Sequence, residues 1–433
     1  MASYPTPPAP DLIKFTTIFF PPFSFLLSTT FFTLAVRHQI PTPARWIYTF
    51  LHTLFSASTL AVLSYAPPFP FDWVLVPSAL FLTLHTASVL IVERKIVLFD
   101  DTTPTTAGER RRELFWAWGN PRGLGRVDAT TRTRTPRIKF ALLRTAHAAV
   151  LLVTYHLLDL LTAHLFQHLE VDPLQDYSPD KQALSLSLTE KDLIVRGVVS
   201  VRWVWKVCLL LTALHNILAV FFVSVLGWDH PAEWPGLFGG IHEGYNLRRF
   251  WGVFWCKIHV RLFEGVMPFR TRTGGSLAKG GEENGGKQEE RGDDGDDNDG
   301  GKQEEKEEEE EGGDVEKQRK GEQPPDRWQR FCHGSLRAWW IFVLSGLFHA
   351  GAVALLTGES HLVAQVAFFF SNYLLCFGEA ALGWLLRVER WVPTEVGWSG
   401  KGVLAVGVRV LGYAWVLGVF FVLVPMWQYP LFN

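Results

Sequence analysis

Cysteine is scarce in this chain, which has four cysteines among its 433 residues. Cys208 and Cys376 lie within long apolar runs, and no two cysteines have the short spacing of a zinc site or a redox pair. We therefore expect neither a disulfide framework nor a bound metal ion.

The motifs of several soluble enzyme classes are also missing. The sequence has no glycine-rich phosphate loop, no G-x-S-x-G nucleophile motif and no internal repeat. These absences argue against a P-loop nucleotidase and an α/β-hydrolase. Secondary transporters usually show repeats with paired broken helices, so this class is disfavoured as well. We also expect no nucleic-acid partner.

Charge of one sign is concentrated in a single segment. The formal net charge is only −2, but residues 281–323 hold 19 acidic and 7 basic side chains. Outside that segment, 34 basic residues face 24 acidic ones, so the rest of the chain is basic. Residues 274–326 have almost no apolar side chains with which to offset the entropy of ordering. They are predicted to form a disordered, acidic, low-complexity insertion.

Apolar residues dominate the remaining sequence, at 48% of the whole chain. A helix needs roughly 20 such residues to cross the hydrocarbon core of a bilayer. Eight stretches qualify, at residues 15–36, 46–65, 73–92, 140–166, 203–228, 338–356, 362–386 and 402–427. We predict an all-α, polytopic transmembrane helical bundle of about eight spans, embedded in a lipid bilayer.

Basic residues indicate which side of the membrane is cytosolic. Eight spans place both termini on one side, and the loops on the other side are rich in lysine and arginine, above all residues 93–139 and 248–272. Basic loops usually face the cytosol. We therefore expect lumenal termini and large cytosolic loops.

One histidine lies near the middle of the sixth predicted span. An ionisable side chain at that depth is costly unless it faces the protein interior or a wet cavity, so His349 is a functional candidate. Ser345 lies one helical turn earlier on the same face. Histidine suits base catalysis because its pKa lies near neutral pH. The alternative is a histidine that only bridges helices, since other predicted spans also contain histidine.

A second candidate segment covers residues 247–262. In one continuous helix its apolar and aromatic residues share a face, which predicts a helix lying in the membrane interface. Four cations flank that face: Arg248, Arg249, Lys257 and Arg261. They could attract the phosphates of coenzyme A. The alternative is binding to anionic lipid headgroups.

Three elements together resemble a known family. Residues 234–238 read Trp-Pro-Gly-Leu-Phe, residues 247–255 read Leu-Arg-Arg-Phe-Trp-Gly-Val-Phe-Trp, and residues 345–349 read Ser-Gly-Leu-Phe-His. In this order they resemble the wax synthase-like branch of the membrane-bound O-acyltransferase (MBOAT) superfamily, in its fungal form, over roughly residues 203–427. Fungal members of that type include acetyltransferases that modify terpenoids and other secondary metabolites.

The resemblance implies a domain organisation and a location. Residues 1–138 would form an N-terminal transmembrane region with three spans and a basic loop. Residues 139–273 and 327–433 would form the wax synthase-like acyltransferase core, which the insertion at 274–326 interrupts. The endoplasmic reticulum is the expected membrane.

The resemblance also implies a reaction. Acyl-CoA, with acetyl-CoA favoured, is expected as a co-substrate, no cofactor is expected to be bound, and the acceptor is a lipophilic alcohol. His349 would be the catalytic base. Supporting roles are expected for Ser345, Asn246, Cys256, Asn372 and Glu379. Acyl-CoA is expected to contact Arg248, Arg249, Trp251, Trp255, Lys257 and Arg261.

Two positions depart from the family pattern. Asn246 stands where the family has Ser or Thr, and Cys256 stands where it has His. The second departure leaves open a catalytically inactive membrane protein, and a transporter also remains an alternative. Within the enzyme hypothesis, wax ester synthesis with a long-chain acyl donor is the alternative to acetyl transfer.

Overall fold

The computed structural model describes residues 10–37, 40–64, 72–91, 106–120, 122, 124, 136–255, 257–267, 327–385 and 403–432. The chain divides into two compact units. One comprises residues 1–268 with 338–433, and the other comprises residues 269–337. In the second unit the described part is residues 327–337, the first turns of a long helix. The predicted insertion at 274–326 lies outside the described residues.

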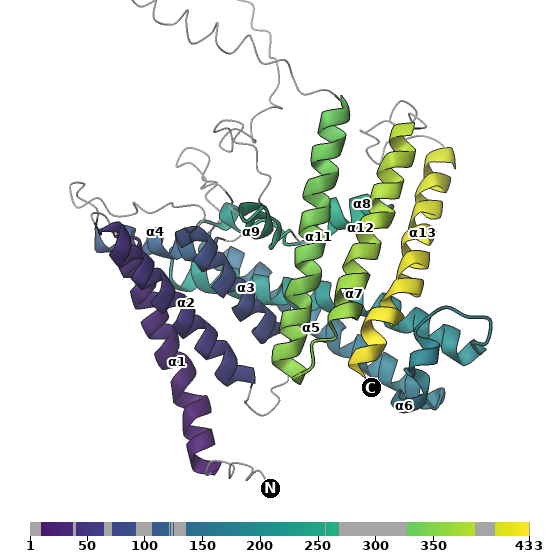
Figure 1. Ribbon diagram of the computed structural model, residues 1–433, viewed down its shortest axis with the longest axis horizontal. Helices are drawn as coiled ribbons and strands as arrows, with labels where there is room; N and C mark the ends of the chain where they lie inside the picture. Colours follow the sequence, from purple (N-terminus) through teal and green to yellow (C-terminus); the bar gives the residue numbers. More distant parts are fainter. Residues whose placement is uncertain are drawn as a thin grey trace, which may run out of the picture. The chain divides into compact units, whose positions relative to one another are not determined.

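Helices form the framework of the first unit, and the described residues contain no strand. All eight predicted apolar stretches lie on long helices (Figure 1). These helices are α1 (Pro10–Ala35), α2 (Thr42–Ser64), α3 (Asp72–Ile91), α5 (Arg137–His168), α7 (Glu190–Ala219), α11 (Arg327–Thr357), α12 (Leu362–Leu385) and α13 (Val403–Gln428). The predicted all-α helical bundle is confirmed.

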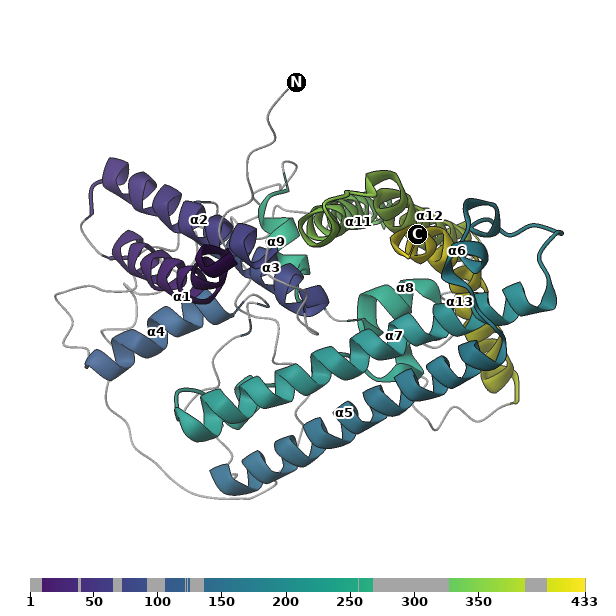
Figure 2. The ribbon, with the colours of Figure 1, turned by 90° about the horizontal axis from the view of Figure 1, so that it is seen from below.

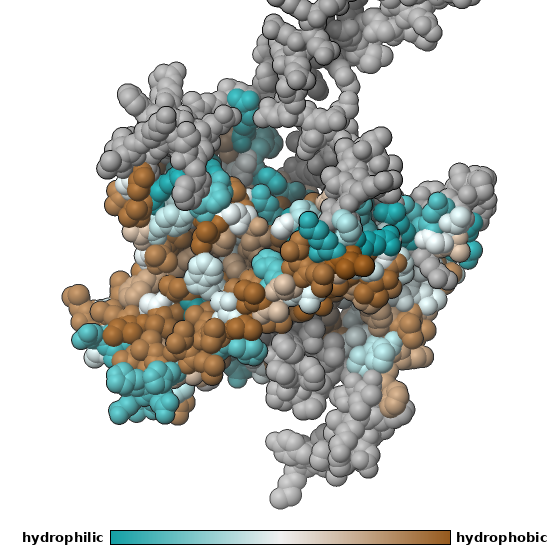
Figure 3. Space-filling model, turned by 180° about the vertical axis from the view of Figure 1, so that it is seen from behind, coloured by the Kyte–Doolittle hydropathy of each residue, from teal (hydrophilic) through white to brown (hydrophobic). Residues whose placement is uncertain are grey.

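Five of the helices in the described residues are long and apolar enough to cross a membrane: α5, α7 with its continuation to Val225, α11, α12 and α13. Helix α5 is the clearest example of a membrane-spanning helix, because almost all of its apolar span is exposed. Leu157, Leu160 and Leu161 are 53%, 66% and 68% exposed. Apolar residues dominate a broad band on the face that carries α5 (Figure 3). An apolar surface of this extent needs lipid to cover it.

Two helices begin with reciprocal caps that satisfy their free backbone N–H groups. Thr106 and Glu109 form a capping box at α4 (Ala107–Gly119), and Thr189 and Asp192 form one at α7. Such caps typically stabilise a helix by about 1 kcal/mol. Between α5 and α7, the short helix α6 (Pro173–Asp176) is capped by Asp172.

Buried polar groups connect the first three helices. The hydroxyl of Ser28 in α1 lies 2.7 Å from Nδ1 of His52 in α2, and Nε2 of His52 lies 2.5 Å from the hydroxyl of Thr86 in α3. Each side chain has partners on a neighbouring helix, as polar groups between membrane helices require. This histidine therefore bridges helices.

Helices α5 and α7 lie side by side (Figure 2) and share an ion-pair cluster. The carboxylate of Asp159 in α5 accepts from Arg202 at 2.7 Å and contacts Lys206 at 2.8 Å, both in α7. Charged groups within spans are normally paired in this way because an isolated charge is costly there.

The largest core cluster surrounds Trp203 of α7. Its ring packs against Trp255 at 5.1 Å between centroids, Trp427 at 5.3 Å and Phe420 at 5.7 Å. Trp427 and Phe420 belong to α13, so this cluster ties α7 to the C-terminal helices. The connection after α7 contributes Trp255 and passes through the middle of the core.

That connection corrects the prediction of one continuous interfacial helix over residues 247–262. The structure has α8 (Leu247–Arg249), a π-helical turn η5 (Phe250–Phe254), an extended residue at Trp255, and then α9 (Val260–Gly265). The apolar face is buried in protein, with Leu247 at 0% and Phe250 at 5% exposure. Packing against α7, α12 and α13 replaces the expected contact with lipid.

Candidate active site

The imidazole of His349 is enclosed by aromatic side chains from neighbouring helices. Phe369 of α12 stacks on the ring at 4.8 Å, and Trp427 of α13 stands perpendicular to it at 6.1 Å. Both imidazole nitrogens lack a hydrogen-bond partner among the described residues. The ring keeps part of its surface uncovered. His349 is therefore held by packing, and both of its nitrogens are available for another molecule.

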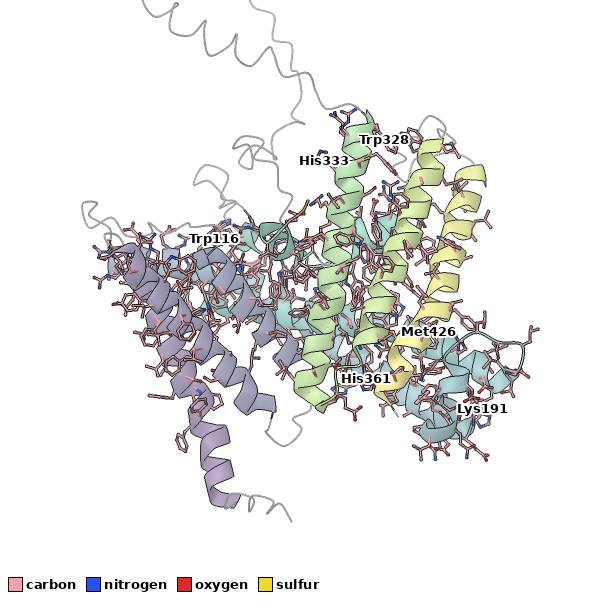
Figure 4. The ribbon with its side chains drawn as sticks, in the orientation of Figure 1. Trp116, Lys191, Trp328, His333, His361 and Met426 are labelled. Carbon is pink, nitrogen blue, oxygen red and sulfur yellow. The ribbon has the colours of Figure 1, made fainter. Side chains whose placement is uncertain are left out.

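Figure 4 locates the surroundings of this site through two labelled residues. Met426 precedes Trp427 in α13, and His361 lies in the turn that joins α11 to α12. The three C-terminal helices lie side by side in Figures 1 and 2. Helix α11 carries His349, and α12 and α13 contribute Phe369 and Trp427 beside it.

Gln365 of α12 holds Trp427 in place, and sequence reasoning missed it. Trp427 donates its indole N–H to Oε1 of Gln365 at 2.5 Å. Gln365 is fully buried, and its Nε2 has no hydrogen-bond partner among the described residues. A fully buried amide in an apolar span is the signal that could have identified it.

Ser345 lies one turn before His349 but uses its hydroxyl locally. The Oγ atom donates to the carbonyl of Ile341 at 2.8 Å. The side chain is 5% exposed. The next residue, Gly346, lies against the backbone of α12: a Cβ atom there would be 2.9 Å from Cα of Val366. The small residues of this segment thus let α12 approach α11 beside the histidine.

Asn372 acts on His349 only through intervening aromatic rings. Its Oδ1 accepts the indole N–H of Trp251 at 3.0 Å, and its Nδ2 donates to the carbonyl of Phe368 at 2.9 Å. Trp251 lies 6.4 Å from Phe369, the ring that stacks on His349. Asn372 therefore fixes Trp251, one of the residues predicted to contact acyl-CoA.

Glu379 anchors the start of α8. Its carboxylate accepts from the backbone N–H groups of Leu247 and Arg248, each at 3.0 Å, and from the indole N–H of Trp415 at 2.7 Å. Asn246 completes this end by accepting from the backbone N–H of Arg249 at 2.8 Å. Among the described contacts, Glu379 and Asn246 thus position the connection and do not touch His349.

The four cations predicted to bind coenzyme A differ in their surroundings. Arg248 and Lys257 are exposed. Arg249 forms an ion pair with Glu243 and lies 5.1 Å from the ring of Tyr245. Arg261 donates to the carbonyl of Asn120 at 3.4 Å. The two exposed side chains are therefore the ones best placed to meet an anionic ligand from solution.

The site was also predicted to include Trp255 and Cys256. Trp255 is 9% exposed and packs in the main core, so it shapes the surroundings of the site. Cys256, which stands where the family has histidine, lies outside the described residues.

A second histidine near His349 escaped the sequence analysis. The ring of His259 packs against Phe263 at 5.2 Å, and Phe263 meets Phe348, the residue before His349, at 6.3 Å. Burial lowers the pKa of His259 to about 4, so its imidazole is neutral at neutral pH. No motif includes this position; its place three residues after Cys256 is the signal that could have found it.

The fold and these contacts define a helical membrane protein in which aromatic side chains enclose a histidine on α11. Comparison with known proteins relates the chain to fungal acetyltransferases. It is 32% identical to acetyltransferase atnC of Arthrinium sp over 125 residues, which cover 29% of this chain and 28% of atnC. It is 41% identical to acetyltransferase ataH of Aspergillus terreus over 58 residues, which cover 13% and 19%.

A third relative is named for a different transfer reaction. The chain is 27% identical to O-mevalon transferase macI of Penicillium terrestre over 164 residues, covering 36% of this chain and 35% of macI. The matches to these three relatives therefore span between 19% and 35% of their lengths. No family model and no solved structure matches the chain.

Proposed function

We propose that this chain is a membrane-bound O-acyltransferase. It transfers an acyl group, with acetyl favoured, from acyl-CoA to the hydroxyl of a lipophilic alcohol such as a terpenoid. The observation that carries this proposal is His349, whose two nitrogens have no hydrogen-bond partner among the described residues although the ring is packed between Phe369 and Trp427. The names of the fungal relatives support the reaction class.

The chemistry requires one base that can also act as an acid. His349 accepts the proton of the acceptor hydroxyl while that oxygen attacks the thioester carbonyl carbon. A carbon–oxygen bond forms and the carbon–sulfur bond breaks. The imidazolium of His349 then returns the proton to the departing coenzyme A thiolate, so no other reactant is consumed.

The surroundings of His349 suit this role. Aromatic side chains from α12 and α13 cover two sides of the ring and limit the access of water, which protects the thioester from hydrolysis. The exposed Arg248 and Lys257 are candidates to hold the phosphates of coenzyme A on the expected cytosolic side. The alcohol reaches the site from the bilayer, where a lipophilic molecule concentrates.

The test compares microsomes that contain the wild-type chain with microsomes that contain His349→Gln or His349→Ala. Radiolabelled acetyl-CoA or palmitoyl-CoA is supplied with a panel of terpenoid and fatty alcohols, and labelled ester is counted in the organic phase. We expect ester from acetyl-CoA with the wild type and a loss of at least about 100-fold in both variants.

The matched control is His156→Ala, because His156 is an exposed histidine on α5. It should retain wild-type activity at equal expression. Ester formed only from palmitoyl-CoA would change the assignment to wax ester synthesis. No ester from the wild type with any donor would contradict the proposed function and favour an inactive membrane protein or a transporter.

A further inference from the structure

His259 lies in the connection between η5 and α9, directly before the first residue of α9. Its ring packs against Phe263 at 5.2 Å. Lys257, two residues earlier, is exposed, whereas Ile258 packs against two apolar clusters of the core. His259 thus lies where the chain passes from the surface into the core.

Helix α9 is fastened to α11 on the side of His349. The indole N–H of Trp340 in α11 donates to the carbonyl of Phe263 at 2.8 Å. The ring of Phe263 also meets Phe348, the residue before His349, at 6.3 Å. These two contacts fix the relation of His259 to α11 over about two helical turns.

Both rings remain available for a ligand. His259, like His349, has no hydrogen-bond partner among the described residues. Both residues are half-buried. Each imidazole can therefore offer its nitrogens to a bound molecule.

We propose that His259 is a second catalytic residue, which donates its imidazole N–H to the carbonyl oxygen of the thioester while His349 activates the acceptor hydroxyl. This inference rests on the proposed function and assigns to His259 the place that the family histidine would occupy at position 256. It names a residue outside the three sequence elements that resemble the family.

The charge states of the two rings suit this division of roles. Burial keeps His259 neutral at neutral pH, and a neutral imidazole carries one N–H donor. The carbonyl oxygen gains negative charge as the acceptor oxygen attacks, and a fixed N–H donor stabilises that charge. In this division of roles His259 keeps its N–H and transfers no proton, because the hydroxyl proton passes to His349.

The experiment measures kcat and KM for acetyl-CoA in microsomes, with the acceptor that gives most ester with the wild-type chain. His259→Leu keeps the approximate volume of the ring but has no donor, whereas His259→Gln keeps an N–H donor. We expect kcat to fall at least about 100-fold in His259→Leu with KM for acetyl-CoA nearly unchanged, and His259→Gln to recover much of that loss.

Three controls separate this role from loss of folding. His242→Ala removes an exposed histidine of the same connection, with a side chain 51% exposed, and should keep full activity. His259→Met provides a second donor-free variant if His259→Leu does not fold, as judged by its thermal midpoint in detergent. His156→Ala, which removes an exposed histidine of α5, should likewise keep the wild-type kcat.

The outcomes distinguish this inference from the proposed function. An active wild type, an inactive His349→Ala and a fully active His259→Leu would overturn the role of His259 alone. Equal loss in folded His259→Leu and His259→Gln would overturn its role as a donor. An inactive wild type would overturn the proposed function, and the role of His259 with it.

Discussion

At the scale of single residues, Glu379 of α12 is an anchor that joins α12 to α8 and α13 by hydrogen bonds. One carboxylate accepts two backbone N–H groups at the start of α8 and an indole N–H from α13. Removing it leaves three donors without this acceptor. Arg248 and Trp415 are exposed, but Leu247 is 0% exposed, and an unsatisfied buried donor costs about 1–3 kcal/mol. We expect Glu379→Ala to lower the thermal midpoint in detergent and to reduce activity, because α8 leads directly to Trp251.

The control for this change is Glu359→Ala, which removes a glutamate whose side chain is 76% exposed. Its thermal midpoint should equal that of the wild type. Glu379→Gln keeps one acceptor oxygen and should fall between the two. If Glu379→Ala melts at the same temperature as Glu359→Ala, the anchoring role of Glu379 is wrong.

The candidate site was predictable only in part from single residues. His349 could be predicted because an ionisable group deep in an apolar span costs free energy and is usually retained for a function. The contacts of Asn372 with Trp251 and of Glu379 with Leu247 could not be predicted, because these partners lie more than a hundred positions away and follow no periodicity. His259 was not predicted, because it lies outside the motif, three residues after Cys256.

At the scale of elements, the contact between α11 and α12 depends on Gly346. A Cβ atom there would meet Cα of Val366 at 2.9 Å and the carbonyl oxygen of Gln365 at 3.4 Å, and both are backbone atoms that cannot rotate away. Gly346→Ala must therefore push the helices apart, at a cost of about 1–3 kcal/mol. We expect a lower thermal midpoint and lower kcat, since Gln365 holds Trp427 beside His349.

Gly351 provides a control on the same helix. A Cβ atom at that position would have no neighbouring atom within 4 Å. Gly351→Ala should leave activity unchanged and raise the thermal midpoint slightly, because alanine favours a helix more than glycine does. Equal effects of the two substitutions would show that the close approach at Gly346 has no role.

The connection from α8 to α9 shows why helix periodicity alone gave a wrong prediction of one interfacial helix over residues 247–262. The apolar residues of 247–262 do share a face in an ideal helix, which indicates a buried side but not what buries it. Here other helices of the same protein cover Leu247, Phe250 and Phe254. A π-helical turn and the extended Trp255 then redirect the chain, and this change of direction brings His259 to α11.

At the scale of the whole molecule, hydrophobicity predicted the helices well because a bilayer imposes their length. The predicted stretch at 362–386 corresponds to α12 at Leu362–Leu385, and the stretch at 73–92 corresponds to α3 at Asp72–Ile91. Helix α4 was not predicted, because it is short and carries a run of charged residues. The sequence also did not predict which helices pack together, because this depends on side-chain contacts such as those of Trp203.

The orientation of the whole chain in the membrane can be tested with one substitution. The loop between α5 and α7 is expected on the lumenal side, and Leu186 at its tip is 108% exposed. The sequence has no N-glycosylation acceptor site, and Ser185→Asn creates one, because Ser187 follows at the required spacing. We expect this variant to gain a glycan in a eukaryotic microsome, seen as a mobility shift that an endoglycosidase reverses.

Ser185→Gln is the matched control, because it changes the same exposed position without creating an acceptor site, and it should show no shift. N-linked glycans are attached only in the lumen. Modification of Ser185→Asn would therefore also place the next connection, which carries Arg248 and Lys257, on the cytosolic side, where acyl-CoA is made available. An unmodified Ser185→Asn chain in the membrane fraction would contradict that orientation. The cations proposed for coenzyme A would then face the lumen, and the donor would need another route to His349.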